Sequence, residues 1–158
     1  MKKQFLFFLF CLCAGVSNVW AQETDWSPLF TRVSEGITYT CENDETYPWE
    51  LVDGSLVSTN KAQSSSSTFT VTITCSNMVK FTMVSFTSSE SPDKIIIKLD
   101  GETRVEYGGE MTTWSSHYFV LTPGEHKMQV SYKKDGSVDR GQDLAKIGGI
   151  RLIDWEKV

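Results

Sequence analysis

Residues 67–75 alternate strictly between apolar and polar side chains. Their sequence, STFTVTITC, puts four apolar side chains, from Phe69 to Cys75, on one side and three threonines on the other. Successive side chains of a β-strand point to opposite faces, so this alternation predicts an antiparallel strand with one buried face. No helix-period stretch longer than about eight residues occurs in the chain, and we expect a single helical turn at most within residues 25–36.

Two pairs of segments are predicted to form β-hairpins. Residues 94–99 (KIIIKL) and 103–107 (TRVEY) flank Asp100-Gly101, a dipeptide typical of two-residue hairpin turns. Residues 116–121 and 126–132 flank the turn sequence TPGE in a similar way. Each pair therefore indicates two neighbouring antiparallel strands.

Further strand candidates complete the pattern. Residues 79–86 are apolar on both faces, which is typical of a strand inside a sandwich. Residues 145–153 carry a Gly148-Gly149 pair that predicts either a β-bulge or a close approach by another backbone. Shorter candidates lie at residues 37–41, 49–51 and 55–59. About eight or nine short strands joined by short turns predict an all-β fold, an antiparallel β-sandwich of the jelly-roll type.

The first 21 residues have the features of a secretory signal peptide. Lys2 and Lys3 precede a short apolar run, and Ala21 supplies the small residue that a signal peptidase requires. The run is shorter than the roughly 20 apolar residues of a membrane span. We therefore expect a signal peptide at 1–21, an N-terminal segment at 22–35 and a β-sandwich domain at 36–158. The protein is expected to be secreted or periplasmic, without membrane insertion of the mature chain.

The charge balance argues against one class of partner. The chain has 15 Lys and Arg against 20 Asp and Glu, a formal net charge of −5. Removal of residues 1–21 takes away two lysines and makes the formal charge −7. An overall charge of this sign does not favour binding to nucleic acid or to anionic lipid.

Two cysteines remain after the predicted signal peptide. Cys41 and Cys75 form an even pair in a compartment that is expected to be oxidising, which favours a disulfide bond between them. The alternative is that Cys75 is a small buried residue and that Cys41 is a free thiol.

The sequence offers no arrangement of residues that predicts catalysis. Ser115, Ser116 and His117 are neighbours on a predicted strand, where adjacent side chains point to opposite faces. The other histidine is His126, and the two histidines lack the spacing of a zinc site. We therefore predict no catalytic residue, no metal ligand and no cofactor, and expect that the protein is not an enzyme.

Residues 133–143 (KKDGSVDRGQD) raise the question of a calcium loop, because they carry Asp135, Asp139 and Asp143. The acids recur every four residues, whereas an EF-hand loop places its oxygen ligands at alternate positions. Three basic residues of the same segment also balance the three negative charges. The spacing favours a tight turn at Asp135-Gly136, with the two later aspartates bonding loop amides, and leaves calcium as the alternative.

Aromatic residues are the best candidates for ligand contact, since Trp and Tyr stack on sugar rings and anchor protein interfaces. Trp114 and Tyr107 flank the turn-rich segment 108–113, and Trp49 lies in a short strand candidate. We predict these three as ligand-binding residues. The alternative, strongest for Trp49, Tyr118 and Trp155, is packing in or around the core.

Three segments, taken in order, resemble a known group of modules. They are residues 88–102, the spaced pattern from Trp114 through Tyr118 and His126 to Tyr132, and residues 133–150. Together they resemble the β-jelly-roll modules of secreted Bacteroidetes-type proteins, similar to cleaved-adhesin and MAM-like domains. The resemblance implies a non-catalytic sandwich used for adhesion, glycan contact or packing beside a partner domain. One position departs, since an Asp common in the last strand of such modules is Gly148 here.

These observations predict a secreted binding module that contacts carbohydrate or a cell-surface protein through Trp114, Tyr107 and Trp49. The main alternative is a structural or assembly subunit of an envelope or surface complex, and a small hydrolase is a third reading. A hydrolase would need a cleft with a catalytic acid or base, and the sequence does not point to one.

Overall fold

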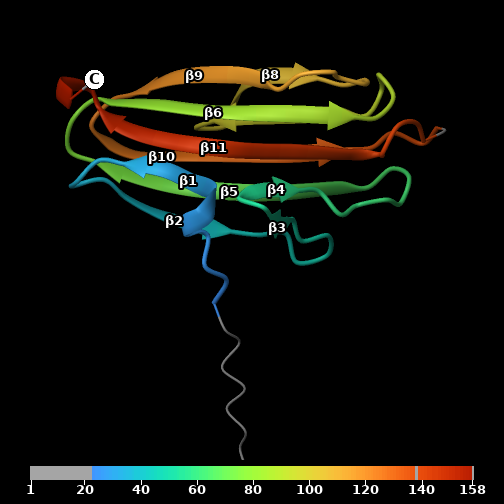
Figure 1. The fold of residues 1–158 in the computed structure, drawn as a ribbon, viewed down its shortest axis with the longest axis horizontal. Coiled ribbons are helices and arrows are strands. Elements are labelled where there is room, and N and C mark those ends of the chain that lie inside the picture. The colour runs from blue at the N-terminus through green and yellow to red at the C-terminus, as the bar shows by residue number, and fades with distance from the viewer. Residues whose placement is uncertain (1–22, 138, 158) are drawn as a thin grey trace, which may run out of the picture.

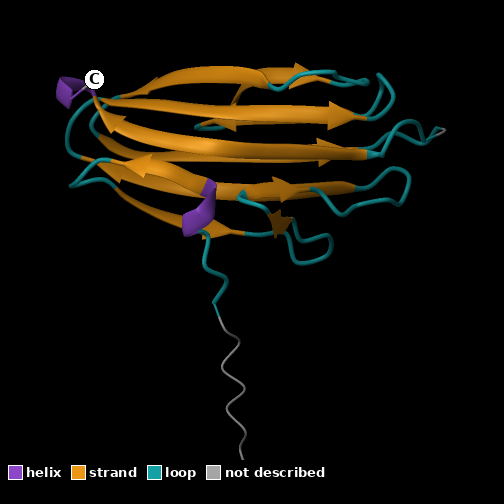
Figure 2. Cartoon of the chain, in the orientation of Figure 1, coloured by secondary structure: helices purple, strands orange, loops and turns teal. Residues whose placement is uncertain are grey.

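The computed structural model describes residues 23–137 and 139–157, so the predicted signal peptide at 1–21 lies outside the described residues. Two sheets pack face to face and are connected by loops, and one short helical turn stands at each end of the described chain (Figures 1 and 2). The described chain contains no helix with the length and apolar character of a membrane span. The elements are η2 (Ser27–Leu29), β1 (Phe30–Val33), β2 (Thr38–Glu42), β3 (Glu50–Val52), β4 (Ser55–Val57), β5 (Ser66–Cys75), β6 (Val79–Ser88), β7 (Lys94–Leu99), β8 (Glu102–Tyr107), β9 (Ser115–Leu121), β10 (Gly124–Lys133), β11 (Leu144–Asp154) and η3 (Trp155–Lys157).

The six-stranded sheet has the order β3-β4-β11-β6-β9, and β1 joins it as a further neighbour of β11. The five-stranded sheet has the order β2-β5-β10-β7-β8. Neighbouring strands are antiparallel except β1, which runs parallel to β11. The predicted all-β antiparallel sandwich is thus confirmed, with eleven strands in the described residues where the sequence indicated about eight or nine.

The core lies between the two sheets and follows the predicted alternation. In β5, Phe69, Val71 and Ile73 are 0% exposed, and β10 pairs with β5 along ten residues and buries Met128 and Val130 beside them. Burial of one full row of apolar side chains per strand supplies most of the stabilising free energy of such a sandwich.

One predicted hairpin is confirmed and the other is wrong. Strands β7 and β8 are joined by Asp100 and Gly101, whose φ values of 53° and 84° match the turn that this dipeptide favours. Strand β9, however, pairs with β6 in one sheet, whereas β10 pairs with β5 and β7 in the other. The alternation of a strand is the same whichever strand it pairs with, so the pattern alone could not reveal this crossing between sheets.

Strand β11 ties the six-stranded sheet together. Its first half pairs with β4, its register shifts between Gly148 and Arg151, and its second half pairs with β1 along the same edge. The register shift confirms the predicted bulge, and Gly149 adopts a left-handed φ of 59° there. Strand β1 was not predicted, because its four residues do not alternate between inward and outward side chains. Part of the 22–35 segment therefore belongs to the sheet.

The predicted disulfide bond between Cys41 and Cys75 is wrong, and both residues are free thiols. Strands β2 and β5 are paired so that Cys41 lies opposite Val71, four residues from Cys75. At about 3.3 Å per residue this offset is roughly 13 Å along the strand, whereas a disulfide requires Cα atoms within about 7 Å of one another. The alternative reading, a buried Cys75 and an unbridged Cys41, is the one that holds.

Candidate functional site on the open sheet face

One side of the six-stranded sheet packs on the core, and we call the outward side the open face. Along β6, buried side chains alternate with half-exposed ones, and the half-exposed set includes Val84 and Phe86. The second apolar side that the sequence indicated for residues 79–86 therefore lies on the open face. The outward side chains of the two neighbouring strands include Ser116, Tyr118 and Val120 in β9 and Lys146 and Arg151 in β11.

A hollow of about 500 Å³ lies in the open face, and we call it the aromatic hollow. The strand register explains its shape. Val84 lies opposite Gly148 on one side and Ser116 on the other, and the small residues Val84, Ser116 and Gly149 line the floor. In the next row, Thr82 lies between Arg151 and Tyr118, whose longer side chains rise beside the floor. The volume falls within the range of roughly 300–1,000 Å³ that is typical of small-ligand sites.

Two aromatic rings stand on this face. Tyr118 is 50% exposed and lines the aromatic hollow. Trp114, which is 43% exposed, packs against Phe86 with 5.7 Å between the ring centres. Phe86 therefore supports Trp114 from the strand below, and an exposed aromatic pair of this kind is a feature of binding surfaces.

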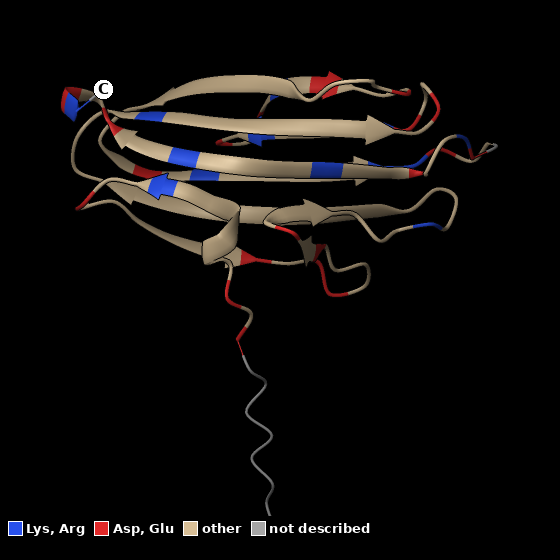
Figure 3. Cartoon of the chain, in the orientation of Figure 1, with Lys and Arg blue, Asp and Glu red and all other residues tan. Residues whose placement is uncertain are grey.

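A smaller hollow of about 120 Å³, which we call the cation hollow, adjoins the aromatic hollow. Its lining includes no acidic side chain of the described residues and consists of Arg32, Lys80, Thr82, Arg151, Ile153 and Lys157. Three of these, Lys80, Thr82 and Arg151, also line the aromatic hollow. In Figure 3 the Lys and Arg segments of β1, β6 and β11 follow one another across the strands of this sheet.

Lys80 links the two hollows electrostatically. Its ammonium nitrogen lies 5.3 Å from the centre of the Tyr118 ring, which is a cation–π geometry. A ligand that stacks on Tyr118 would therefore have a positive charge beside its ring.

The three sequence-predicted contact residues do not come together. Trp114 lies on the open face, as expected for a contact residue. Trp49 is only 2% exposed and belongs to the core, so the prediction that it contacts a ligand is wrong. Tyr107 packs against the core, and its hydroxyl lies 2.6 Å from the Ser85 hydroxyl. Tyr118, which was expected to pack in or around the core, is exposed instead, because it alternates along β9 with Phe119, which packs against the core.

Ser85, His117 and Tyr107 form a polar contact between the sheets. Ser85 Oγ lies 2.5 Å from His117 Nε2, and Ser85 is 0% exposed. Burial lowers the pKa of His117 and raises the pKa of Tyr107. Since Ser85 is closed off from solvent, and the hydrogen bonds of the described residues give His117 no carboxylate partner, this contact joins the two sheets and lacks the access that a catalytic serine needs.

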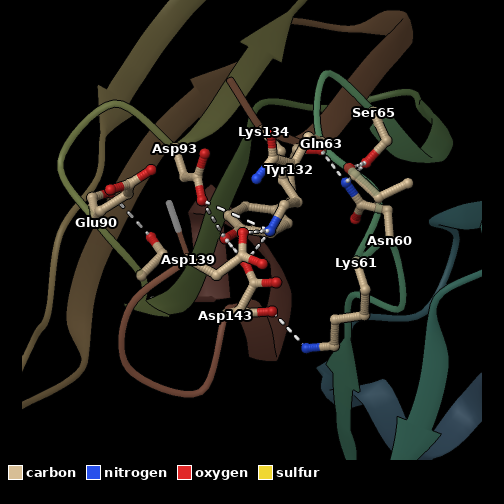
Figure 4. Close-up of polar contacts among 12 residues, drawn as sticks. Asn60, Lys61, Gln63, Ser65, Glu90, Asp93, Tyr132, Lys134, Asp139 and Asp143 are labelled. Carbon is tan, nitrogen blue, oxygen red and sulfur yellow. Dashed lines mark hydrogen bonds and ion pairs between the residues drawn. The ribbon is translucent and has the colours of Figure 1, made fainter. Parts of the chain in front are cut away.

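The loop at one end of the sandwich is organised around Lys134 (Figure 4). The Lys134 side chain is 1% exposed, and its ammonium donates to Asp139 Oδ1 at 2.6 Å and to Asp143 Oδ1, with Asp93 Oδ2 at 3.9 Å. The Tyr132 hydroxyl donates to Asp143 Oδ1 at 3.1 Å. Burial lowers the pKa of Lys134, but its hydrogen bonds to the two aspartates raise that pKa more, so the net change is upward.

This arrangement, which we call the Lys134 cluster, revises the reading of the loop. Asp139 and Asp143 were expected to bond loop amides, and that expectation is wrong because they bond Lys134. The turn at Asp135 forms as predicted, since Asp135 Oδ1 accepts a hydrogen bond of 2.7 Å from the Ser137 amide. The carboxyl oxygens of Asp93, Asp139 and Asp143 lie within 4.8 Å of one another, and a lysine ammonium supplies positive charge among them.

No family model matches the chain, and no curated protein matches it in a sequence search. Among solved structures, the secreted serine protease VesC from Vibrio cholerae is similar over 72% of this chain, with 16% identity and a TM-score of 0.59. The matched part spans only 24% of the VesC chain. This likeness concerns the fold, a β-sandwich. In VesC the matched sandwich is one part of a longer chain.

Two carbohydrate-binding modules also match in structure. TmCBM61, solved in complex with β-1,4-galactotriose, matches 73% of this chain and 88% of its own, with 14% identity and a TM-score of 0.46. A family 35 carbohydrate-binding module from Clostridium thermocellum matches 72% of this chain and 92% of its own, with 12% identity and a TM-score of 0.36. The resemblance to cleaved-adhesin and MAM-like modules stays a prediction.

Proposed function

We propose that this protein is a non-catalytic carbohydrate-binding module and that the open face is its binding surface. The observation that carries the proposal is the aromatic hollow, in which a floor of small side chains lies beside the half-exposed ring of Tyr118. The predicted signal peptide supports a site of action outside the cytoplasm.

A sugar fits the chemistry of this surface. One side of a sugar ring presents C–H groups that stack on an aromatic face, while its edge presents hydroxyls that need hydrogen-bond partners. Tyr118 offers the aromatic face, and Thr82 and Ser116 offer hydroxyl groups within the same hollow. Because these residues lie on paired strands, the site is held by the sheet before a ligand arrives.

A protein partner fits less well. The centre of a protein interface is depleted of charged residues and packs tightly. The aromatic hollow instead carries Lys80 at its wall, and lysine is depleted at such interfaces. An extended ligand that leaves this charge partly hydrated suits the surface better than the apolar centre of a protein contact.

The test is binding of the full chain to immobilised glycans, with and without chelator, by the wild type and by two single variants. Tyr118→Ala and Trp114→Ala should each weaken binding at least about tenfold, since a buried aromatic contact is worth more than about 1.4 kcal/mol. Trp155→Ala is the matched control, because Trp155 is also 43% exposed but belongs to η3 after the last strand, whereas Trp114 packs against Phe86 of the open face. All three variants should keep the circular dichroism spectrum of the wild type.

Two results would contradict the proposal. Binding that is unaffected by Tyr118→Ala and Trp114→Ala would move the binding surface away from the open face. Absence of binding to any glycan, combined with capture of a protein partner that both variants abolish, would make the open face a protein interface.

A further inference from the structure

We infer that the ligand of the open face is an anionic polysaccharide whose carboxylate or sulfate groups enter the cation hollow. This inference rests on the proposed function and adds the chemical class of the ligand. Arg151, Arg32 and Lys80 are the residues assigned to the anion.

The first observation is the concentration of positive charge. Arg32 and Arg151 are register partners on β1 and β11, and Lys80 lies opposite Ile153 of the same β11 strand. Together with Lys157, these side chains surround a hollow of about 120 Å³. Placing four cations around one hollow costs electrostatic free energy in the unliganded protein, and an anion in the hollow would offset that cost.

The second observation is that these cations form no close ion pair, although Lys157 lies near enough to Asp154 to help lower the pKa of that carboxyl. None of the four forms an ion pair with another residue of the described chain. Among the Lys and Arg of the described residues only Arg104 and Lys134 form an ion pair, so what distinguishes the four cations is that they gather around one hollow whose lining holds no acidic side chain. In a chain with a formal charge of −5, a group of unpaired cations without lining acids is a local departure from the overall composition.

The third observation is that the cation hollow continues into the aromatic hollow through Lys80, Thr82 and Arg151. A sugar ring stacked on Tyr118 would lie close to the Lys80 ammonium, which is 5.3 Å from the centre of that aromatic ring. An acidic group on this sugar, or on its neighbour in the polymer, would then face the guanidinium of Arg151. A guanidinium matches a carboxylate or a sulfate with two parallel hydrogen bonds.

A polysaccharide explains these features better than nucleic acid or a membrane. A phosphate backbone is neutralised by a wide positive surface, and a bilayer surface is flat. Here four cations gather around the cation hollow, whereas the aromatic hollow has Lys80 and Arg151 at its wall beside Tyr118, and Lys146 lies 6.0 Å from the centre of the Phe86 ring farther along the face. That arrangement matches a polymer with sugar rings and spaced acidic groups.

The experiment compares binding of the full chain to polygalacturonate, to dextran sulfate and to the neutral polymers galactan and dextran, at low and at high salt. Duplex DNA and anionic lipid vesicles are measured beside them as other polyanions. Arg151→Gln and Arg32→Gln each remove one charge from the cation hollow. Arg104→Gln is the matched control, because it removes the same charge from β8 in the other sheet. Thermal unfolding of each variant checks that the fold is retained, and Arg32→Gln keeps the test valid if Arg151→Gln fails to fold.

We expect one of the acidic polymers to bind at least about tenfold tighter than both neutral polymers, with weaker binding at high salt. Arg151→Gln and Arg32→Gln should reduce this binding several-fold, and Arg104→Gln should leave it within about twofold. Preference for polygalacturonate would assign carboxylate groups, and preference for dextran sulfate would assign sulfate groups.

Three results would overturn the inference. Equal binding of acidic and neutral polymers, unchanged by Arg151→Gln, would leave the proposed function standing and remove the role of the cations. Binding of none of the polymers would remove both. Equal binding of duplex DNA or of anionic lipid vesicles would mean that the cation hollow attracts any polyanion and does not select a polysaccharide.

Discussion

Lys134 and Asp139 are joined by a hydrogen-bonded ion pair of 2.6 Å, although the lysine side chain is 1% exposed and the aspartate side chain is 47% exposed. The other side chains around the ammonium are much less accessible, since Asp93 is 2% and Asp143 is 12% exposed. The partners of Lys134 should therefore differ strongly in what they contribute to stability.

Replacement of Lys134 by Met should destabilise the protein severely. Methionine keeps much of the apolar stem but removes the ammonium, so the buried carboxylates of Asp93 and Asp143 lose their positive partner. The free energy of unfolding should fall by about 3–5 kcal/mol, as when one partner of a buried ion pair is removed. Urea denaturation measures this loss.

Asp139→Asn is the control for that variant. Because Asp139 is half-exposed, its loss should cost about 1 kcal/mol or less. Equal losses in the free energy of unfolding from Lys134→Met and Asp139→Asn would mean that burial does not decide how much each residue of the Lys134 cluster contributes to stability.

The two histidines should titrate in opposite directions from the ordinary pKa. Burial lowers the pKa of His126, but hydrogen bonds to Asp100 and to the Thr122 carbonyl raise it more, so its net pKa is raised. Both contacts are 2.8 Å, and since a carbonyl and a carboxylate only accept, both ring nitrogens must carry protons. Burial lowers the pKa of His117. Histidine resonances followed by NMR against pH should give one pKa above and one below about 6.5.

These shifts fix the sign of the stability change with pH. Above about pH 6.5 and up to the raised pKa of His126, the folded state binds more protons than the unfolded state, so stability falls as pH rises. Between the lowered pKa of His117 and about pH 6.5, the unfolded state binds more protons, so stability rises with pH. His126→Gln should remove the first slope and keep the second. A variant that keeps the first slope would contradict the assignment to His126.

Cys41 and Cys75 should be slow to react in the folded protein. Burial raises the pKa of Cys41 to about 12 and also raises the pKa of Cys75, so little thiolate exists at neutral pH. Iodoacetamide should modify both residues quickly only after unfolding, without any reductant, as peptide mapping would show. A requirement for reductant before labelling would instead reveal the disulfide that the strand register excludes.

Gly108→Ala should disturb the loop that carries Asp93. A Cβ atom at position 108 would lie 1.9 Å from the Asp93 carbonyl oxygen and 2.7 Å from the Ser91 carbonyl oxygen, so the backbone must move. We expect a loss of at least about 2 kcal/mol in the free energy of unfolding, in the range of severe overpacking. Gly136→Ala is the comparison, because its Cβ would meet only the Ser64 hydroxyl, at 3.4 Å. If both variants unfold at the same temperature, the close approach at Gly108 is not tight.

Local pattern accounts for most of the strands and for little of their arrangement. The alternation of residues 67–75 was sufficient to predict a strand, and Asp100-Gly101 was sufficient to predict a turn, because each depends on neighbours in sequence. The separation of β9 and β10 into different sheets was not predictable in this way, since both strands keep their alternation in either pairing. Strand β1 exists because β11 offers it an edge beyond the bulge.

The candidate site was predictable only in part, for a related reason. Trp114 could be chosen from its turn-rich context, and it lies on the open face. Trp49 has an equally suggestive context but lies in the core, because it directly precedes β3, which pairs with β4 and its buried Leu56. The cation hollow combines Arg32, Lys80 and Arg151, which are far apart in sequence, so only the strand register could bring them together.

The cation hollow can form only after its last strand has been synthesised. Arg32 belongs to the first strand of the sandwich, whereas Arg151 and Lys157 belong to its last strand and to the turn that follows. During synthesis the early strands emerge first, and β11 can close the six-stranded sheet only when translation of the sandwich is almost finished. A nascent chain with β6 and β9 already paired would have part of the aromatic surface but no cation hollow. The capacity to hold an anion would thus arrive last, with the final strand.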